Sequence, residues 1–327
     1  MAGREITVRE ALCEALREEM IRDKRVFVIG EEVYGGPGGF KGAFKVTEGL
    51  VAEFADRLLD TPICEQTIVG AALGAAMTGL RPVAEIMYED FITLAMDQLV
   101  NSAASTCFMS NGQYHAPMVV RASCGSLGTH PHTWTSWFMH VPGLYVAFPS
   151  NAYDAKGLLK TAIRDENPVL FLEHRKLYNI KGEVPEEEYL VPLGQARTVI
   201  PGESVTVVAV GHMVHLAESV AEEMRGEGVS VELVDPRCLA PLDLDTIVGS
   251  VRKTHKVVVV AEDWRTAGPT AEMAALIGEQ CFEYLDGPVI RVGARDTFIP
   301  HNLGMRQHVI PGAAQIRQAV ERAIEWR

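Results

Sequence analysis

One carboxylate, Glu65, opens an apolar run in the segment DTPICEQTIVGAALGAAMTGL, residues 60–80. Every residue from Ile68 to Met77 is apolar or glycine, so we expect a helix that is buried on most sides. A carboxylate at its start either satisfies free N–H groups and the helix dipole or is kept in an apolar place for proton chemistry. The pattern alone favours the first role, which most such residues have.

Two other segments carry residues that could bind a ligand. Residues 31–42, EEVYGGPGGFKG, are rich in glycine but contain neither GxGxxG nor GK[ST], so we interpret them as a flexible loop rather than a phosphate cradle. Residues 123–137 contain His130 and His132. This HxH pair could bind a metal, but no acidic or cysteine ligand stands at a matching interval, so a zinc site is the less favoured interpretation.

Composition excludes several classes of protein. The 327 residues suffice for two domains, and 47% of them are apolar. The net charge of −13 argues against binding to nucleic acid or to an anionic membrane surface. No apolar run approaches the roughly 20 residues of a membrane span. The six cysteines form no CxxC pair, which is typical of reduced thiols in a cytoplasmic protein.

Short β-rich runs alternate with helical patterns along the chain. Thr7 and Glu10 have the spacing of a capping box at the start of the first helix. The alternation predicts parallel sheets with helices on both faces, and a polar segment at 174–194 is predicted to be a linker. The predicted strands are 25–30, 81–87, 117–123, 144–149, 168–174, 204–211, 229–237, 256–264 and 288–293, and the predicted helices include 93–109, 154–166, 213–227, 242–252, 270–280 and 313–326.

Several segments carry a family resemblance: GEEV (30–33), FKVTEGL (44–50), DTPICE (60–65), GAALGAAMTGLRPVAEIM (70–87), MDQLVNSAA (96–104), HVPGL (140–144) and DAKGLLKTAIRDENPVLFLEH (154–174). They resemble the β subunits of thiamine diphosphate-dependent 2-oxo acid dehydrogenases, which include the pyruvate, branched-chain and acetoin enzymes and are relatives of transketolase. The resemblance implies two doubly wound α/β domains. Residues 1–185 would be a transketolase-like pyrimidine-binding domain and residues 186–327 a transketolase C-terminal domain.

The resemblance also implies partners and cofactors. In that family the β chain pairs with an α chain in an α2β2 heterotetramer with a β–β contact, and the complex passes its acyl product to a lipoyl acyltransferase. Thiamine diphosphate lies between α and β, and a GDG…N motif of the α chain holds its diphosphate and Mg²⁺. This sequence contains no GDG, as expected of a chain that supplies half of an active site.

The resemblance changes the favoured role of Glu65 from capping of the helix to proton chemistry. The family's glutamate at this place hydrogen-bonds the aminopyrimidine ring, and an apolar pocket disfavours an ionised carboxylate, so such a group can share a proton. Phe91 matches an aromatic residue that packs on the pyrimidine, although it could be an ordinary core residue. Met87 matches a pyrimidine-contacting position and could equally belong to the core. The glycines at 70, 74 and 79 would let the helix pack closely against its neighbours.

His130 stands ten residues before His140, as does the family's active-site histidine, which assists acyl transfer to the lipoyl group. The family's HSQ is HPH here, so His132 is a rival. Trp134, Trp137 and residues 299–307 depart from the family pattern, which leaves open an acetoin-cleaving or carboligating enzyme without lipoyl transfer, or a non-catalytic scaffold. Five positions match a structural potassium site and could equally be a capped helix end: Met118, Ala162, Ile163, Asp165 and Asn167.

Overall fold

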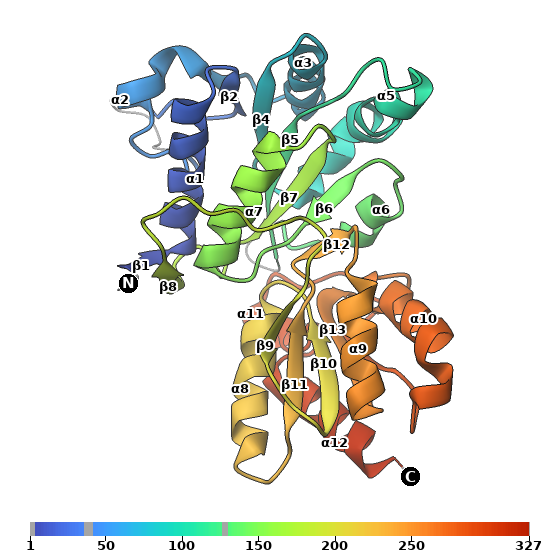
Figure 1. Ribbon diagram of the computed structural model, residues 1–327. Helices are drawn as coiled ribbons and strands as arrows, with labels where there is room; N and C mark the ends of the chain where they lie inside the picture. Colours follow the sequence, from blue (N-terminus) through green and yellow to red (C-terminus); the bar gives the residue numbers. More distant parts are fainter. Residues whose placement is uncertain (1–3, 36–41, 126–129, 327) are drawn as a thin grey trace. The chain divides into compact units, whose positions relative to one another are not determined.

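The structure is a computed structural model that describes residues 4–35, 42–125 and 130–326. The centre of the glycine-rich segment, 36–41, and part of the histidine-bearing segment, 126–129, lie outside the described residues. The chain divides into two compact units (Figure 1): residues 1–124 with 137–193, and residues 125–136 with 194–327. Within the residues that the structure describes, no helix combines the length and the apolar character that crossing a membrane requires.

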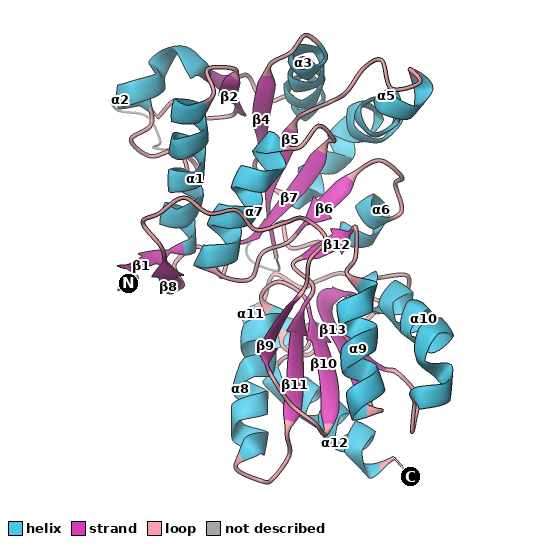
Figure 2. Ribbon diagram, in the orientation of Figure 1, coloured by secondary structure: helices cyan, strands magenta, loops and turns pink. Residues whose placement is uncertain are grey.

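The first unit is built on a parallel sheet with the strand order β6-β7-β5-β4-β2-β3. All residues of β2, β4, β5 and β7 are buried, as expected for a parallel sheet covered by helices (Figure 2). The strands are β2 (Val26–Gly30), β3 (Leu58–Asp60), β4 (Arg81–Ile86), β5 (Val119–Cys124), β6 (Tyr145–Ala147) and β7 (Val169–His174).

The helices of this unit begin and end close to their predicted positions, with one exception. The capping box of Thr7 and Glu10 is present at the start of α1. Residues 93–109, predicted as one helix, instead form a 3₁₀ turn, a π-helical stretch at Asp97–Ala103 and the short helix α5. The other helices are α1 (Val8–Arg22), α2 (Val51–Phe54), α3 (Glu65–Met77), α4 (Glu89–Ile92), α5 (Ala104–Met109), α6 (Thr135–Met139) and α7 (Ala152–Arg164).

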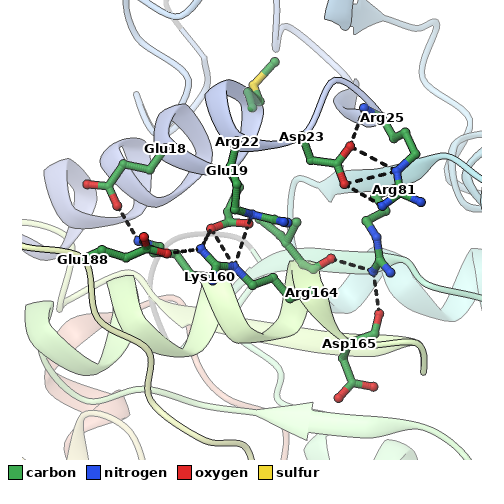
Figure 3. A network of polar contacts seen from close by, with 12 residues as sticks. Glu18, Glu19, Arg22, Asp23, Arg25, Arg81, Lys160, Arg164, Asp165 and Glu188 are labelled. Carbon is green, nitrogen blue, oxygen red and sulfur yellow. Dashed lines mark hydrogen bonds and ion pairs between the residues drawn. The ribbon is translucent and has the colours of Figure 1, made fainter.

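Helices α1 and α7 pack side by side through buried charges (Figure 3). Lys160 is buried, and its ammonium group lies 2.6 Å from the carboxylate of Glu18. Glu19 is also fully buried and accepts hydrogen bonds from Arg164 on α7. Each buried charge therefore has an oppositely charged partner, which offsets the free-energy cost of removing it from water.

The segment 174–194, predicted to be a linker, ends where the second unit begins, but it also contains a strand. Residues Lys181–Val184 form β8, which pairs antiparallel with β1 (Arg4–Thr7). Leu177 and Val191 in the same segment are buried. Polar residues dominate this segment, so the short strand and the few buried side chains could not be recognised from the sequence. A two-stranded ribbon needs only short runs of alternating side chains.

The second unit contains a five-stranded sheet in the order β14-β13-β10-β11-β9. Strand β9 is antiparallel to β11, and the other pairs are parallel. Helix α8 packs against α12, and α9 packs against α10. The elements are β9 (Arg197–Ile200), β10 (Val205–Ala209), β11 (Val231–Asp235), β12 (Cys238–Ala240), β13 (Val257–Trp264), β14 (Ile290–Ala294), α8 (Met213–Arg225), α9 (Leu244–Thr254), α10 (Pro269–Cys281), α11 (Leu303–Arg306) and α12 (Ala313–Glu325).

Candidate active site

The site lies at the edge of the first unit's sheet where its parallel strands end. Strands β2, β3 and β4 run in the same direction and end at Gly30, Asp60 and Ile86. In open parallel sheets, ligands bind beyond these carboxyl ends. Gly30 permits the close approach of β4, because a Cβ atom there would come within 2.7 Å of the Glu85 carbonyl oxygen. Glu65 follows β3 and Met87 follows β4, so the fold brings both predicted residues to one edge.

Glu65 is the first residue of α3, and only 5% of its surface is exposed. Cys64, which precedes it, makes no side-chain capping bond to the helix. Within the described part of the chain, the Glu65 carboxylate makes no hydrogen bond or ion pair. A buried carboxylate is costly unless it meets a donor. Its position therefore fits a ligand that brings an N–H group to this edge, as an aminopyrimidine with a protonated ring nitrogen would.

Helix α3 is less buried than its sequence predicts. Ile68, Val69, Ala72 and Leu73 are in the core, but Ala71, Gly74 and Met77 are exposed. A Cβ atom at Gly74 would meet no atom within 4 Å. The expectation that this glycine packs closely against a neighbour is therefore wrong within this chain, and one small-residue face of the helix stays uncovered.

Glu31 is a site residue that the sequence analysis did not single out. It follows β2 directly, and burial together with the carboxylates of Glu65, Glu32 and Glu85 raises its pKa. Carboxylates that lie close together in a partly desolvated site repel one another, which favours the protonated form. The two consecutive glutamates of the GEEV segment, which follow a buried strand, were the signal that could have identified Glu31.

Met87 and Phe91 are both half-buried beside this edge. The Met87 carbonyl accepts a hydrogen bond from the Ser123 hydroxyl. The Phe91 ring meets Tyr88 edge to face at 5.6 Å, and Tyr88 meets Phe44 in the same way at 5.7 Å. Phe91 thus belongs to a row of aromatic rings, and its side chain is partly exposed, which leaves surface for a ligand ring.

A buried charge cluster fixes the strands behind the site. Arg121 on β5 donates to Glu85 on β4 at 2.7 Å and to Glu173 on β7 at 2.6 Å. Tyr178 donates its hydroxyl to Glu173 at 2.8 Å. The two carboxylates raise the pKa of Arg121, whereas burial raises the pKa of Glu85. A charged residue in the interior of each of three neighbouring, otherwise mostly apolar strands was the sequence signal for this cluster.

His130 and His132 group with the second unit. The His132 ring lies 5.7 Å from the rings of both Trp134 and Trp264, and Phe298 meets it edge to face at 5.8 Å. His132 is therefore a packing residue of an aromatic cluster. His130 is half-buried and precedes this cluster.

A buried carboxyl group also anchors the histidine-bearing segment. Asp263, near the end of β13, accepts a hydrogen bond from the Thr135 hydroxyl, and the Thr133 hydroxyl also lies close to it. Burial is the main cause that raises the pKa of Asp263 to about 7, and the charge of Glu262 adds to it. The sequence analysis did not single out Asp263.

Four of the five residues matched to a potassium site lie at or just after the end of α7, whereas Met118 immediately precedes β5. Arg81 donates to the carbonyl oxygens of Ile163 and Asp165 at 3.0 and 2.9 Å. The Asp165 carboxylate accepts from both nitrogens of Asn167 at 2.8 Å. The Ala162 and Met118 carbonyls accept backbone N–H groups. These contacts match a capped helix end (Figure 3), and the potassium site stays a prediction.

Comparisons with known proteins agree with this architecture. Residues 4–181 match the family "Transketolase, pyrimidine binding domain", and residues 194–316 match "Transketolase, C-terminal domain". The chain is 43% identical to the pyruvate dehydrogenase E1 component subunit beta of Rickettsia felis, covering 97% of this chain and 98% of that protein. It is 40% identical to the acetoin:2,6-dichlorophenolindophenol oxidoreductase subunit beta of Cupriavidus necator, covering 99% and 98%.

Among solved structures, a split-gene transketolase described as an inactive beta4 tetramer matches with a TM-score of 0.79 and 24% identity, covering 98% of this chain and 99% of that chain. That likeness shows the fold. The sequence matches extend along almost the whole chain at 40% identity or more. The chain therefore belongs to the transketolase-like family of β subunits that includes those of the pyruvate dehydrogenase E1 component.

Proposed function

We propose that this protein is the β subunit of a thiamine diphosphate-dependent 2-oxo acid dehydrogenase, an oxidoreductase, and that it supplies the pyrimidine side of the active site. The observation that carries the proposal is the Glu65 carboxylate, which is buried at the carboxyl edge of the sheet and meets no donor within the described part of the chain. The relatives named pyruvate dehydrogenase E1 subunit beta support the reaction class.

The residues of this chain would act by binding and by holding a proton. Thiamine diphosphate, when bound, supplies the nucleophilic carbon and the electron sink for decarboxylation. Glu65 would hold a proton against a pyrimidine ring nitrogen, Phe91 would stack on the ring and Met87 would contact it. Glu31 would add a second carboxyl group near Glu65, and its pKa is raised by burial and by the neighbouring carboxylates. His130 would supply a proton during transfer to a lipoyl group.

The proposed partner is an α subunit that carries the diphosphate and Mg²⁺ site, in an α2β2 heterotetramer with a β–β contact. The first unit exposes apolar side chains that such a partner would cover: Ile63 is 79% exposed and Phe108 is 88% exposed. Exposed apolar groups near a site are typical of interfaces. A lipoyl acyltransferase would be the acceptor.

The division into a pyrimidine-binding domain at 1–185 and a C-terminal domain at 186–327 also remains a proposal, supported by the family matches over 4–181 and 194–316. A location in the cytoplasm is proposed on chemical grounds. All six cysteines carry free thiols, as a reducing compartment favours.

Reconstitution with the α subunit tests the proposal that this chain supplies only half of the active site (the half-site). The chain is purified alone and co-purified with its α partner, and cofactor binding is measured by calorimetry with thiamine diphosphate and Mg²⁺. We expect binding, and reduction of an artificial electron acceptor by a 2-oxo acid, only in the assembled complex. Robust turnover by the isolated chain would contradict the half-site. Absence of cofactor binding in the assembled complex would contradict the enzymatic role.

A further inference from the structure

The second unit contains a cavity of about 600 Å³ whose polar wall is dominated by arginine. Strand β14, helix α12 and residues 308–311 surround it, and Arg265, Arg291, Arg295 and Arg322 all line it. This volume falls within the range of small-molecule sites. No residue of the proposed active site lines this cavity.

The local fold explains why these arginines converge. Strand β14 is the edge strand, and along it Ile290, Val292 and Ala294 are buried while Arg291 is only half-buried. The Arg291 guanidinium donates to the Arg265 carbonyl at 2.9 Å, which fixes its position. The Arg295 N–H donates to the Val309 carbonyl at 3.0 Å and holds the segment 308–311 beside the strand.

Helix α12 supplies another part of the wall. Gln315, Gln318, Arg322 and Glu325 line the cavity at intervals of three or four residues, which is the spacing of one helix face. The two amide side chains are exposed and can both donate and accept hydrogen bonds. The wall thus combines the Arg322 guanidinium group, the Glu325 carboxylate and two neutral amides that could contact the organic part of a ligand.

These four arginines differ from their neighbour Arg317 in their ion pairing. Arg317, also on α12, pairs with Glu227 at 2.5 Å and with Glu321 at 2.9 Å. None of the four cavity arginines makes an ion pair with a carboxylate of the described residues. Glu321, which also lines the cavity, is already engaged by Arg317. On a chain of net charge −13, a hollow with unpaired guanidinium groups is a local reversal of charge that favours an anion.

We propose that this cavity binds a small organic anion that carries at least two phosphoryl groups. Guanidinium groups present planar pairs of N–H donors that match phosphate oxygens. Arg291 on β14 and Arg322 on α12 both line the cavity, so each could contact one of two phosphoryl groups. The apolar side chains of Ile290 and Ile310 and the amides of Gln315 and Gln318 would receive the organic part. The proposal goes beyond the proposed function and does not depend on it.

Calorimetry of the full 327-residue chain at low ionic strength tests this, with ADP, inorganic pyrophosphate and adenosine as probes. We expect ADP to bind with one site per chain, pyrophosphate to bind more weakly, and adenosine to show no binding. Arg291→Gln and Arg322→Gln should each weaken ADP binding roughly ten- to hundred-fold, as expected for the loss of a charge-assisted hydrogen bond.

Arg225→Gln is the matched control, because it removes the same charge from an exposed position of helix α8 in the same unit that does not line the cavity. It should change ADP affinity by no more than about two-fold. The proposal would be overturned if neither ADP nor pyrophosphate binds, or if Arg225→Gln weakens ADP binding as much as Arg322→Gln does. Equal affinity for pyrophosphate and ADP would overturn the role assigned to the apolar wall and the amides. Circular dichroism and thermal unfolding confirm that each variant is folded.

Discussion

Arg121 and Glu173 face each other across neighbouring strands in a buried two-pronged ion pair. The Arg121 Nε lies 2.6 Å from Glu173 Oε1, and a terminal guanidinium nitrogen lies 2.9 Å from Glu173 Oε2. Both side chains are almost inaccessible to solvent. Because the pair joins β5 to β7, it fixes the strands behind the carboxyl edge where Glu65 and Met87 lie.

Removing the positive charge of this pair should strongly destabilise the protein. Arg121→Met would leave the carboxylates of Glu173 and Glu85 buried without a cation, which typically costs about 3–5 kcal/mol. Arg17 offers a matched control, because it makes the same two-pronged contact with Glu53, at 2.8 and 2.9 Å, but on the exposed surface. Arg17→Met should cost less than about 1 kcal/mol. Urea unfolding followed by circular dichroism measures both, and equal losses would contradict the role of burial.

Asp263 should make the stability of the second unit depend on pH. Its folded pKa is raised to about 7 from the ordinary value of 3.8, so the folded state keeps a proton that the unfolded state loses. Stability from this group is therefore fully present below about pH 4 and is lost as the pH rises toward 7. Asn cannot ionise, so the melting temperature of Asp263→Asn should rise relative to that of the wild type as the pH is raised from 5 to 8.

Calorimetric melting curves across that pH range check the Asp263 prediction. Asp245→Asn is the control, because it removes a carboxyl group from an exposed position of α9 in the same unit. If the difference in melting temperature between Asp263→Asn and the wild type stays constant from pH 5 to pH 8, burial does not hold the proton on Asp263.

Substitution of His130 should impair catalysis, whereas substitution of His132 should impair packing. His130→Ala should spare 2-oxo acid decarboxylation measured with an artificial acceptor, yet slow acyl transfer to a lipoyl domain by about a hundred- to ten-thousand-fold, because opening of the lipoyl disulfide leaves a thiolate that needs a proton. His132→Ala should instead lower thermal stability, since its ring lies among Trp134, Trp264 and Phe298.

Both reactions are measured in the complex reconstituted with the α subunit and a lipoyl domain. A transfer defect in His132→Ala, with none in His130→Ala, would move the proton donor two residues along the chain. If neither variant separates the two reactions, lipoyl transfer is not the reaction of this protein.

The strands were predictable because parallel sheets need nearly continuous apolar runs, as at 205–209 and 257–261. The π-helical stretch at Asp97–Ala103 was not, because π- and α-helices place apolar residues at similar intervals. Glu65 was found through a family motif, since its pattern alone resembles an ordinary helix start. Asp263 could not be found, because only the fold brings Thr135 to it.

Glu65→Gln in the assembled complex tests the central claim most directly. Glutamine keeps the shape and a hydrogen bond but cannot pass a proton, so folding, association with the α subunit and cofactor binding should persist. The measurement is the rate of H/D exchange of the thiazolium C–H proton of bound thiamine diphosphate, followed by NMR after acid quench. The account predicts slowing by at least about a hundred-fold. Exchange near the wild-type rate, with the cofactor fully bound, would contradict the role of Glu65.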